Sequence, residues 1–349
     1  MRKRYVPTVA LASIAAAFVS THAPELVGAG SPAALAAVVT NVTPVALTKV
    51  LRLDERDRAG RHLGFDTYAY PGDDVMRAWR DEAPYEWVGY YLPAPCHKGR
   101  SWVGTRERLA DMGWGMAVLY VGQQTWDKTP RGFETTYRTV RRTKYVSKRV
   151  KTSVVVNGRR TTRYVTRKVP VRHTVRVPVH VAVNPRQRPL DDCNAQLVNG
   201  VRGKIEASDA IRRSVAEGFP RGTVIFLDVE YMTKTPSKMR EYYRAWTRQV
   251  LADGRFRPGV YAHTRNAAVI YDDVKTEYAR AGNMEEPPFW ISGGRENFSP
   301  DKAPHEVGHA FAAMWQGLLD VVEEWNGHAL PIDVNVAAVP DPSHRYVAD

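Results

Sequence analysis

Short apolar runs alternate with segments of helical spacing along much of the chain. Apolar runs at 64–68, 87–92 and 116–121 predict three strands, and the periodicity of 73–82 and 102–112 predicts the helices between them. Strands that alternate with helices are typical of βαβ units around a parallel sheet.

The same rhythm resumes near residue 208. Helical spacing at 208–217 and 237–251 predicts two further helices. Five more strands are predicted, at 223–230, 258–263, 289–292, 310–316 and 331–335. We therefore expect an α/β fold in which eight strands form a (β/α)8 TIM-type barrel over residues 61–340, since such barrels typically need ~200–250 residues. An open doubly wound sheet is the alternative, although no Gly-x-Gly-x-x-Gly follows a strand.

A β-rich insertion at 127–190 interrupts the barrel pattern. Valines occupy odd positions from 165 to 183, in register with two arginines and a histidine, and this period of two is typical of an extended strand. The Asn-Gly pair within 156–159 predicts a type I′ turn. Pro170 and Pro178 favour a position at a sheet edge. We expect a long basic β-hairpin subdomain inserted in a barrel loop.

The net charge of +13 is concentrated in this insertion. Residues 131–188 contain 17 Lys or Arg and one acid, Glu134, so the rest of the chain has 33 bases against 36 acids. The segment therefore predicts an anionic partner, such as a wall polymer, a phospholipid surface or nucleic acid. The alternative is a solvated strand edge guarded by cations. Nucleic acid is disfavoured because the chain has an export signal and no nucleic-acid motif.

The N-terminus has the features of a signal peptide. A positive start at 1–4 precedes an Ala-rich apolar stretch at 9–19, and the small residues of 34–36 suit a cleavage site. We expect a signal peptide over 1–36, a linker over 37–60 and a mature protein that is secreted or wall-associated, with an uncleaved anchor as the alternative. The two cysteines, Cys96 and Cys193, would form a disulfide in an exported protein or remain as two thiols.

Asp228 and Glu230 close the apolar strand predicted at 223–230. Residues two apart on a strand point the same way, so the two carboxyls form a pair at the barrel mouth. Neighbouring acids raise each other's pKa, and one can stay protonated as a general acid, as glycoside hydrolysis requires. The alternative is a solvated strand end or an acid pair bound to arginine.

Asp66 and Asp333 extend this acidic set. Each lies in a predicted strand, where a charge is expensive unless it is used or paired. The first and last strands of a closed barrel are neighbours, so the two carboxyls could lie side by side. A buried acid that accepts backbone hydrogen bonds is the alternative for each.

Aromatic and amide side chains at the strand ends could form a sugar-binding groove, although such rings more often belong to the core. The candidates for substrate binding are Tyr68, Tyr91, Tyr261, Trp290, Trp315 and Gln316. His305 and His309 are four apart but lack a third ligand, so no metal is expected, and no other cofactor is implied.

The order of these motifs resembles the barrel of family 25 glycoside hydrolases, the bacterial and phage muramidases. The motifs that carry the resemblance are Gly64–Tyr68, Asp228–Glu230, Gly259–Tyr261, Phe289-Trp290, Trp315-Gln316 and Ile332–Asn335. The early part, with 87–91 and 113–124, is still more similar to the glycoside-hydrolase-like domain of unknown function 1906, common in exported actinobacterial proteins. Together the resemblance covers about 60–340 apart from the insertion.

The resemblance implies a barrel with a carboxylate-lined groove. Glu230 would match the general acid, and Asp228 the partner that orients the substrate or stabilises developing positive charge. Asp66 and Asp333 would match the supporting acids. The basic insertion departs from the muramidase pattern, in which the loop after the third strand carries no such hairpin.

Two hypotheses follow. The first is an exported glycoside hydrolase that acts on peptidoglycan or a related glycan. The second is a non-catalytic wall-binding protein on a hydrolase scaffold, held to anionic polymers by residues 131–188. A scaffold for a protein that docks on the hairpin edge is a third interpretation.

Overall fold

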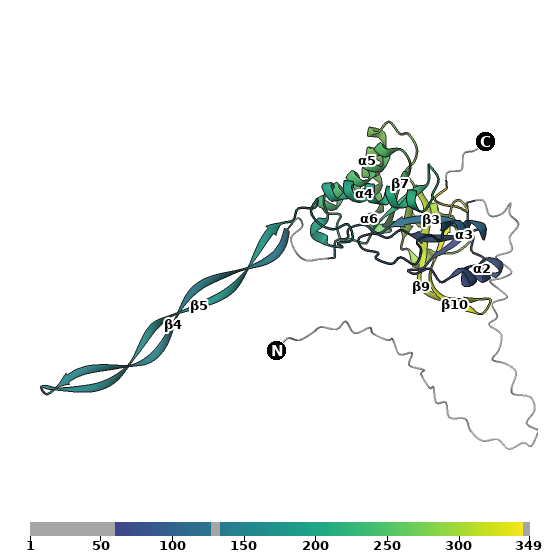
Figure 1. Cartoon of the computed structure of the whole chain (residues 1–349). Helices are drawn as coiled ribbons and strands as arrows, with labels where there is room; N and C mark the ends of the chain where they lie inside the picture. Colours follow the sequence, from purple (N-terminus) through teal and green to yellow (C-terminus); the bar gives the residue numbers. More distant parts are fainter. Residues whose placement is uncertain (1–59, 127–132, 345–349) are drawn as a thin grey trace, which may run out of the picture. The chain divides into compact units, whose positions relative to one another are not determined.

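The computed structural model describes residues 60–126 and 133–344 (Figure 1). The predicted signal peptide and nearly all of the predicted linker lie outside the described residues. Within the described part, no helix is both long and apolar enough to cross a membrane.

Eight strands close into a barrel in the order β1-β10-β9-β8-β7-β6-β3-β2, which confirms the predicted α/β barrel. They are β1 His62–Asp66, β2 Trp87–Tyr91, β3 Gly115–Tyr120, β6 Val224–Val229, β7 Arg257–His263, β8 Phe289–Ser292, β9 Ala312–Trp325 and β10 His328–Ala337. β10 runs antiparallel to both of its neighbours, unlike the parallel strand of a regular (β/α)8 unit. The reason is the connection before it, because Asn326 and Gly327 both have positive φ in a two-residue hairpin turn.

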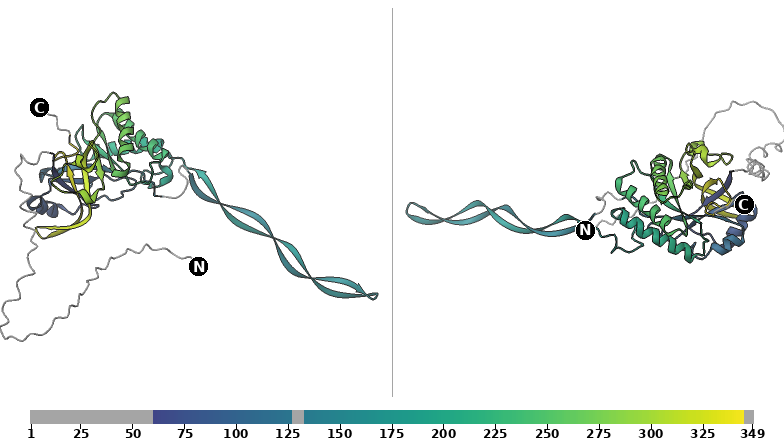
Figure 2. Two further views of the ribbon diagram at one scale, coloured as in Figure 1. Left: turned by 180° about the vertical axis from the view of Figure 1, so that it is seen from behind. Right: turned by 90° about the horizontal axis from the view of Figure 1, so that it is seen from above.

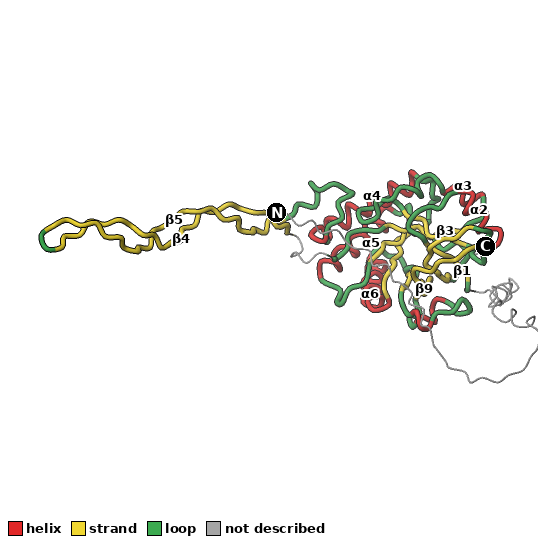
Figure 3. Tube along the Cα trace, turned by 90° about the horizontal axis from the view of Figure 1, so that it is seen from below, coloured by secondary structure: helices red, strands yellow, loops and turns green. Residues whose placement is uncertain are grey.

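Helices surround the strands of the barrel (Figure 3). They are α2 Asp73–Glu82, α3 Arg106–Asp111, α4 Gly200–Ala216, α5 Ser237–Asp253 and α6 Thr264–Arg280. α4 begins eight residues before the predicted 208, because the Asn199 side chain accepts the Arg202 N–H and caps the helix there. α6 was not predicted, although Ala267, Ile270 and Val274 form its buried stripe.

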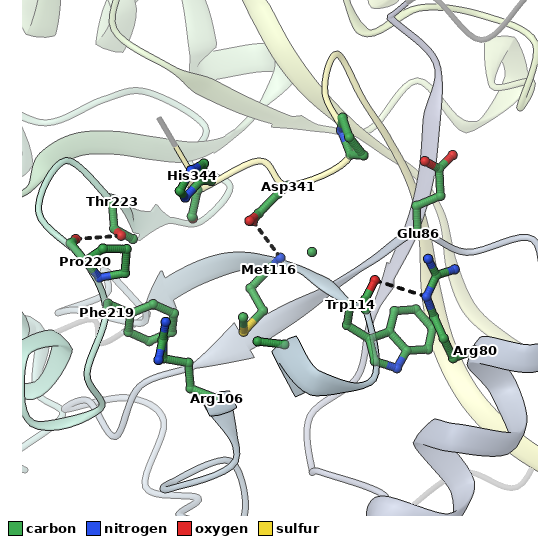
Figure 4. Close-up of a pocket in the computed structure, with 15 residues that line it drawn as sticks. Arg80, Glu86, Arg106, Trp114, Met116, Phe219, Pro220, Thr223, Asp341 and His344 are labelled. Carbon is green, nitrogen blue, oxygen red and sulfur yellow. Dashed lines mark hydrogen bonds between the residues drawn. The ribbon is translucent and has the colours of Figure 1, made fainter. Parts of the chain in front are cut away.

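The C-terminal segment seals the barrel at the N-terminal ends of the parallel strands. The Ser343 hydroxyl accepts the Val118 N–H, and the Ser343 carbonyl accepts the Val224 N–H. A cavity of about 400 Å³ lies at this end, between the start of β3 and the C-terminal segment (Figure 4). Arg80, Arg106 and Asp341 are among the residues that line it.

The insertion folds as the predicted basic hairpin. β4 (Phe133–Val156) and β5 (Arg159–Ala182) pair only with each other and coil into a twisted ribbon (Figure 2). Asn157 and Gly158 have φ of 50° and 73°, as a type I′ turn requires. Both strands are therefore edges, which accommodates Pro170 and Pro178.

A buried polar network holds the segment that returns from the hairpin. Arg202 is fully buried, pairs with Glu206 at 2.5 Å and donates to four carbonyls between Pro185 and Leu190. Cys193 in this segment forms a disulfide with Cys96. The path of the chain between the hairpin and α4 is thus fixed by covalent and charge-assisted contacts.

Candidate active site

Polar side chains gather where the parallel strands of the barrel end. Asp66 and Tyr91 are the last residues of β1 and β2, Asp228 lies one residue before the end of β6, and Tyr261 follows on β7. β9 and β10 add Gln316, Asp333 and Asn335. This edge is where catalytic groups of barrel enzymes are found.

The pairing of strands brings the predicted acids together. Asp66 lies directly opposite Asp333 in the β1–β10 register, as expected for neighbouring first and last strands. Asp228 lies opposite Tyr261 in the β6–β7 register, and Glu230 comes directly after the last residue of β6. The four carboxyls therefore belong to one site.

Asp66 is the most completely hydrogen-bonded of these carboxyls. Its Oδ2 accepts the Tyr91 hydroxyl at 2.7 Å, and its Oδ1 accepts the amides of Gln316 at 2.9 Å and Asn335 at 2.8 Å. Burial raises the Asp66 pKa, and the three donors oppose that rise by stabilising the carboxylate. Asn335 is the last residue of the Ile332–Asn335 motif, and its side-chain amide stabilises the Asp66 carboxylate.

Gln316 links three groups of the site. Its Nε2 donates to Asp66 and, at 3.1 Å, to Asp333, while its Oε1 accepts the Tyr261 hydroxyl at 2.6 Å. The Asp333 carboxylate also accepts the Asp320 N–H at 2.7 Å. Burial and then the charge of Asp66 raise the Asp333 pKa to about 7. The site thus holds a carboxyl that titrates near neutrality.

Asp228 and Glu230 differ in exposure. Asp228 is buried, and its Oδ1 has no hydrogen-bond partner among the described residues. Burial raises the Asp228 pKa well above its ordinary value, and Glu230 and Asp66 add to the rise. Glu230 is only partly buried; burial raises its pKa too, while the backbone N–H of Tyr231 opposes the rise. The pair therefore combines a buried acid with one that solvent can reach.

Gln124, which the sequence did not reveal as part of the site, bridges the backbone of this pair. It lies just after β3, donates its Nε2 to the Asp228 carbonyl at 3.0 Å and accepts the Glu230 N–H at 3.3 Å. It also lines a cavity of about 260 Å³ with Trp126 and the Cys193–Ala195 segment. Gln124 ends the 113–124 stretch that carries the family resemblance, but its contacts depend on the pairing of β3 with β6.

The predicted aromatic residues divide into three groups. Tyr68 is 65% exposed, and its ring lies 4.6 Å from His97, which in turn stacks on Tyr91 of the site. Tyr91 and Tyr261 are hydrogen-bonded members of the carboxylate network. Trp290 and Trp315 are fully buried and donate their indole N–H groups to Asn335 and to the Gly293 carbonyl, so neither offers a ring face to solvent.

A further exposed ring lies beside Glu230. Tyr231 is 48% exposed and packs edge-on against His263.

His309 forms a hydrogen bond with the Thr264 hydroxyl. In the described ranges, no three His, Cys, Asp or Glu side chains are grouped to hold a metal ion.

A model of Rv2525c-like, glycoside hydrolase-like domains matches residues 77–337. The match begins after Asp66 and includes the hairpin. A search of curated proteins finds no match.

Three solved structures are similar at low identity. An uncharacterized protein of B. stearothermophilus has 14% identity over 79% of this chain and 95% of its own, with a TM-score of 0.45. The Mycobacterium tuberculosis Tat-secreted protein Rv2525c has 13% identity over 79% and 95%, with a TM-score of 0.43. The Clostridium perfringens spore cortex lytic enzyme SleM has 11% identity over 79% and 67%, with a TM-score of 0.41.

Proposed function

The chain belongs to the Rv2525c-like, glycoside hydrolase-like domain family, and on that premise we propose that it is an exported glycoside hydrolase of the cell wall. The substrate is peptidoglycan or a related glycan. The observation that carries the proposal is the pair formed by Asp228 and Glu230, both with raised pKa values at the barrel mouth. Neighbouring carboxyls with raised pKa values suit the general-acid step of glycoside hydrolysis, which needs a protonated acid.

In this mechanism Glu230 donates its proton to the glycosidic oxygen as the bond between that oxygen and the anomeric carbon breaks. A water molecule then forms the new bond to the anomeric carbon and gives up a proton to a carboxylate of the site, which completes the hydrolysis. The partial exposure of Glu230 leaves its carboxyl accessible to a glycan, whereas Asp228 is more deeply buried and serves as the partner that orients the sugar. Asp66 accepts hydrogen bonds from three donors, which favour its anionic form. Its negative charge would stabilise the positive charge that develops on the sugar. Asp333 supports Asp66 through Gln316.

The sugar-binding surface is formed by exposed rings that follow the acids in the chain. Tyr68 lies two residues after Asp66, and Tyr231 directly follows Glu230. Both rings are about half exposed or more, so they can stack on sugar faces on either side of the cleaved bond.

The ribbon supports a second element of the proposal, retention on an anionic wall polymer through residues 131–188. Strands β4 and β5 carry 14 Lys or Arg and one acid, Glu134. Attraction between such a segment and a polyanion weakens with salt. The disulfide between Cys96 and Cys193 suits the oxidising environment outside the cytoplasm. Wall binding without hydrolysis is the alternative function that this ribbon favours.

Hydrolysis of purified peptidoglycan, measured as new reducing ends, tests the proposal. Glu230→Gln should lower the rate at least ~100-fold, the usual contribution of a general acid. Glu82→Gln, an exposed glutamate that ends α2, is the matched control and should retain the wild-type rate. If neither wild type nor control releases reducing ends while both sediment with the wall, the result supports the alternative function, wall binding without hydrolysis.

A further inference from the structure

The two faces of the ribbon carry equal numbers of Lys and Arg but different uncharged side chains. Because side chains alternate along each strand, even residues of β4 share a face with odd residues of β5. Seven of the 14 cations lie on each face. We call the face with the valine pairs the valine face and the opposite one the tyrosine face.

Valines on the valine face have a structural role. The register places Val140 opposite Val175, and two further Val–Val pairs occur at 146/169 and 150/165. All six side chains are partly buried. Cross-strand pairs of β-branched residues stabilise a two-stranded ribbon, which is marginal by itself. These six valines thus pack within the ribbon.

Aromatic residues of the tyrosine face have no such partner. Tyr137, Tyr145 and Tyr164 are 58%, 69% and 58% exposed. Tyr137 lies opposite Pro178 and Tyr145 opposite Pro170. Proline has no N–H, so these pairs cannot exchange hydrogen bonds, and residues in such pairs lie closer together. Each of these two tyrosines therefore has a proline as its cross-strand neighbour, and its side chain stays more than half exposed.

Cations lie beside two of these rings, those of Tyr137 and Tyr164. The Arg176 guanidinium lies 5.0 Å from the centre of the Tyr137 ring, and that of Arg149 lies 5.8 Å from the Tyr164 ring. Within the described residues, no carboxylate forms an ion pair with any cation from Arg138 to Arg176. The face therefore repeats an exposed ring beside a cation that has no acidic partner.

We propose that the tyrosine face binds a glycan with regularly spaced phosphate or carboxylate groups, its sugars on the tyrosines and its anionic groups on the neighbouring arginines. The inference rests on the wall-polymer role proposed above and adds the binding face and the chemistry of the partner. A flat membrane fits less well, since cations on both faces of a twisted ribbon cannot meet one plane. A flexible polymer can follow the twist.

The test measures binding of the mature protein at fixed ionic strength to three polymers. Hyaluronate has a carboxylate on alternate sugars, linear polyphosphate has charge without sugar, and dextran has sugar without charge. One variant replaces Tyr137, Tyr145 and Tyr164 by threonine, which keeps strand propensity. Circular dichroism checks that the ribbon persists.

Two charge-matched variants separate the faces. One carries Arg→Gln at four arginines of the tyrosine face, 141, 149, 172 and 176, and the other at four of the valine face, 138, 142, 163 and 167. A third variant replaces 133–182 by a short glycine linker, which can close because Phe133 and Ala182 are register partners.

We expect the tyrosine variant to bind hyaluronate ~10-fold more weakly while its affinity for polyphosphate is unchanged. The tyrosine-face arginine variant should lose more hyaluronate affinity than its matched partner. Equal losses in the two arginine variants, with no loss in the tyrosine variant, would overturn the face assignment but leave the polymer role intact. Tighter binding to phosphatidylglycerol vesicles than to hyaluronate would also overturn it. If the ribbon deletion binds hyaluronate as well as wild type, the polymer role itself fails.

Discussion

Replacing Asp333 by asparagine should change how the stability of the barrel depends on pH. The folded-state pKa of Asp333 is raised from 3.8 to about 7 by burial and by Asp66. A raised carboxyl pKa means that the folded state binds the proton more tightly than the unfolded state. This contribution to stability is therefore full below pH ~3.8 and is lost as the pH rises through ~7.

The size of the effect follows from the shift. A rise from 3.8 to about 7 corresponds to ~4 kcal/mol at ~1.4 kcal/mol per pKa unit. Asp333 is partly exposed, so solvent screening reduces this to ~2 kcal/mol. Asparagine cannot titrate. It replaces one of the two carboxylate oxygens by an amide NH2, and the loss of this hydrogen-bond acceptor should lower the free energy of unfolding by ~1 kcal/mol at every pH.

The assay is urea unfolding at pH 4.5 and pH 8.5. Between these values the free energy of unfolding should fall by ~2 kcal/mol more in the wild type than in Asp333→Asn. Asp81→Asn, at an exposed position on α2, is the control and should follow the wild type. Parallel pH dependence in wild type and Asp333→Asn would show that this carboxyl is not held protonated by the site.

Three further substitutions test the contacts around the site. Gln316→Leu removes partners from two carboxyls and a tyrosine and should cost ~3 kcal/mol in urea unfolding; a cost below ~1 kcal/mol would contradict the network. Changing both Cys96 and Cys193 to serine should cost ~2–5 kcal/mol, and unchanged stability under non-reducing conditions would mean that the bond does not constrain the chain. Arg202→Met removes the cation that pairs with the buried Glu206 carboxylate and should lower the free energy of unfolding by ~3–5 kcal/mol in thermal or urea unfolding. A change near zero would show that this ion pair is solvated.

Much of the barrel could be predicted because its strands are short, apolar and bounded by helices. The predicted 289–292 and 73–82 coincide with β8 and α2. The direction of β10 could not be predicted, since the alternation of side chains is the same for parallel and antiparallel strands. The Asn326-Gly327 turn was the available signal for an antiparallel hairpin.

The candidate site was only partly visible in the sequence. The meeting of Asp66 with Asp333 followed from barrel closure, and the structure places them opposite each other. The role of Gln124 could not be predicted, because its contacts with Asp228 and Glu230 arise from the pairing of two strands separated by the whole insertion. Sequence pattern shows which residues lie on strands, whereas side-chain partners across a barrel depend on its register.

The most direct measurement of the central claim is the chemistry of the product. Mature protein would be incubated with purified peptidoglycan, the new ends reduced with borohydride, and the fragments analysed by mass spectrometry. The account predicts reduced sugar ends with wild type and their loss with Glu230→Gln, while both proteins sediment equally with the wall. Sugar ends released equally by both proteins, or fragments cleaved in the peptide instead of the glycan, would contradict it.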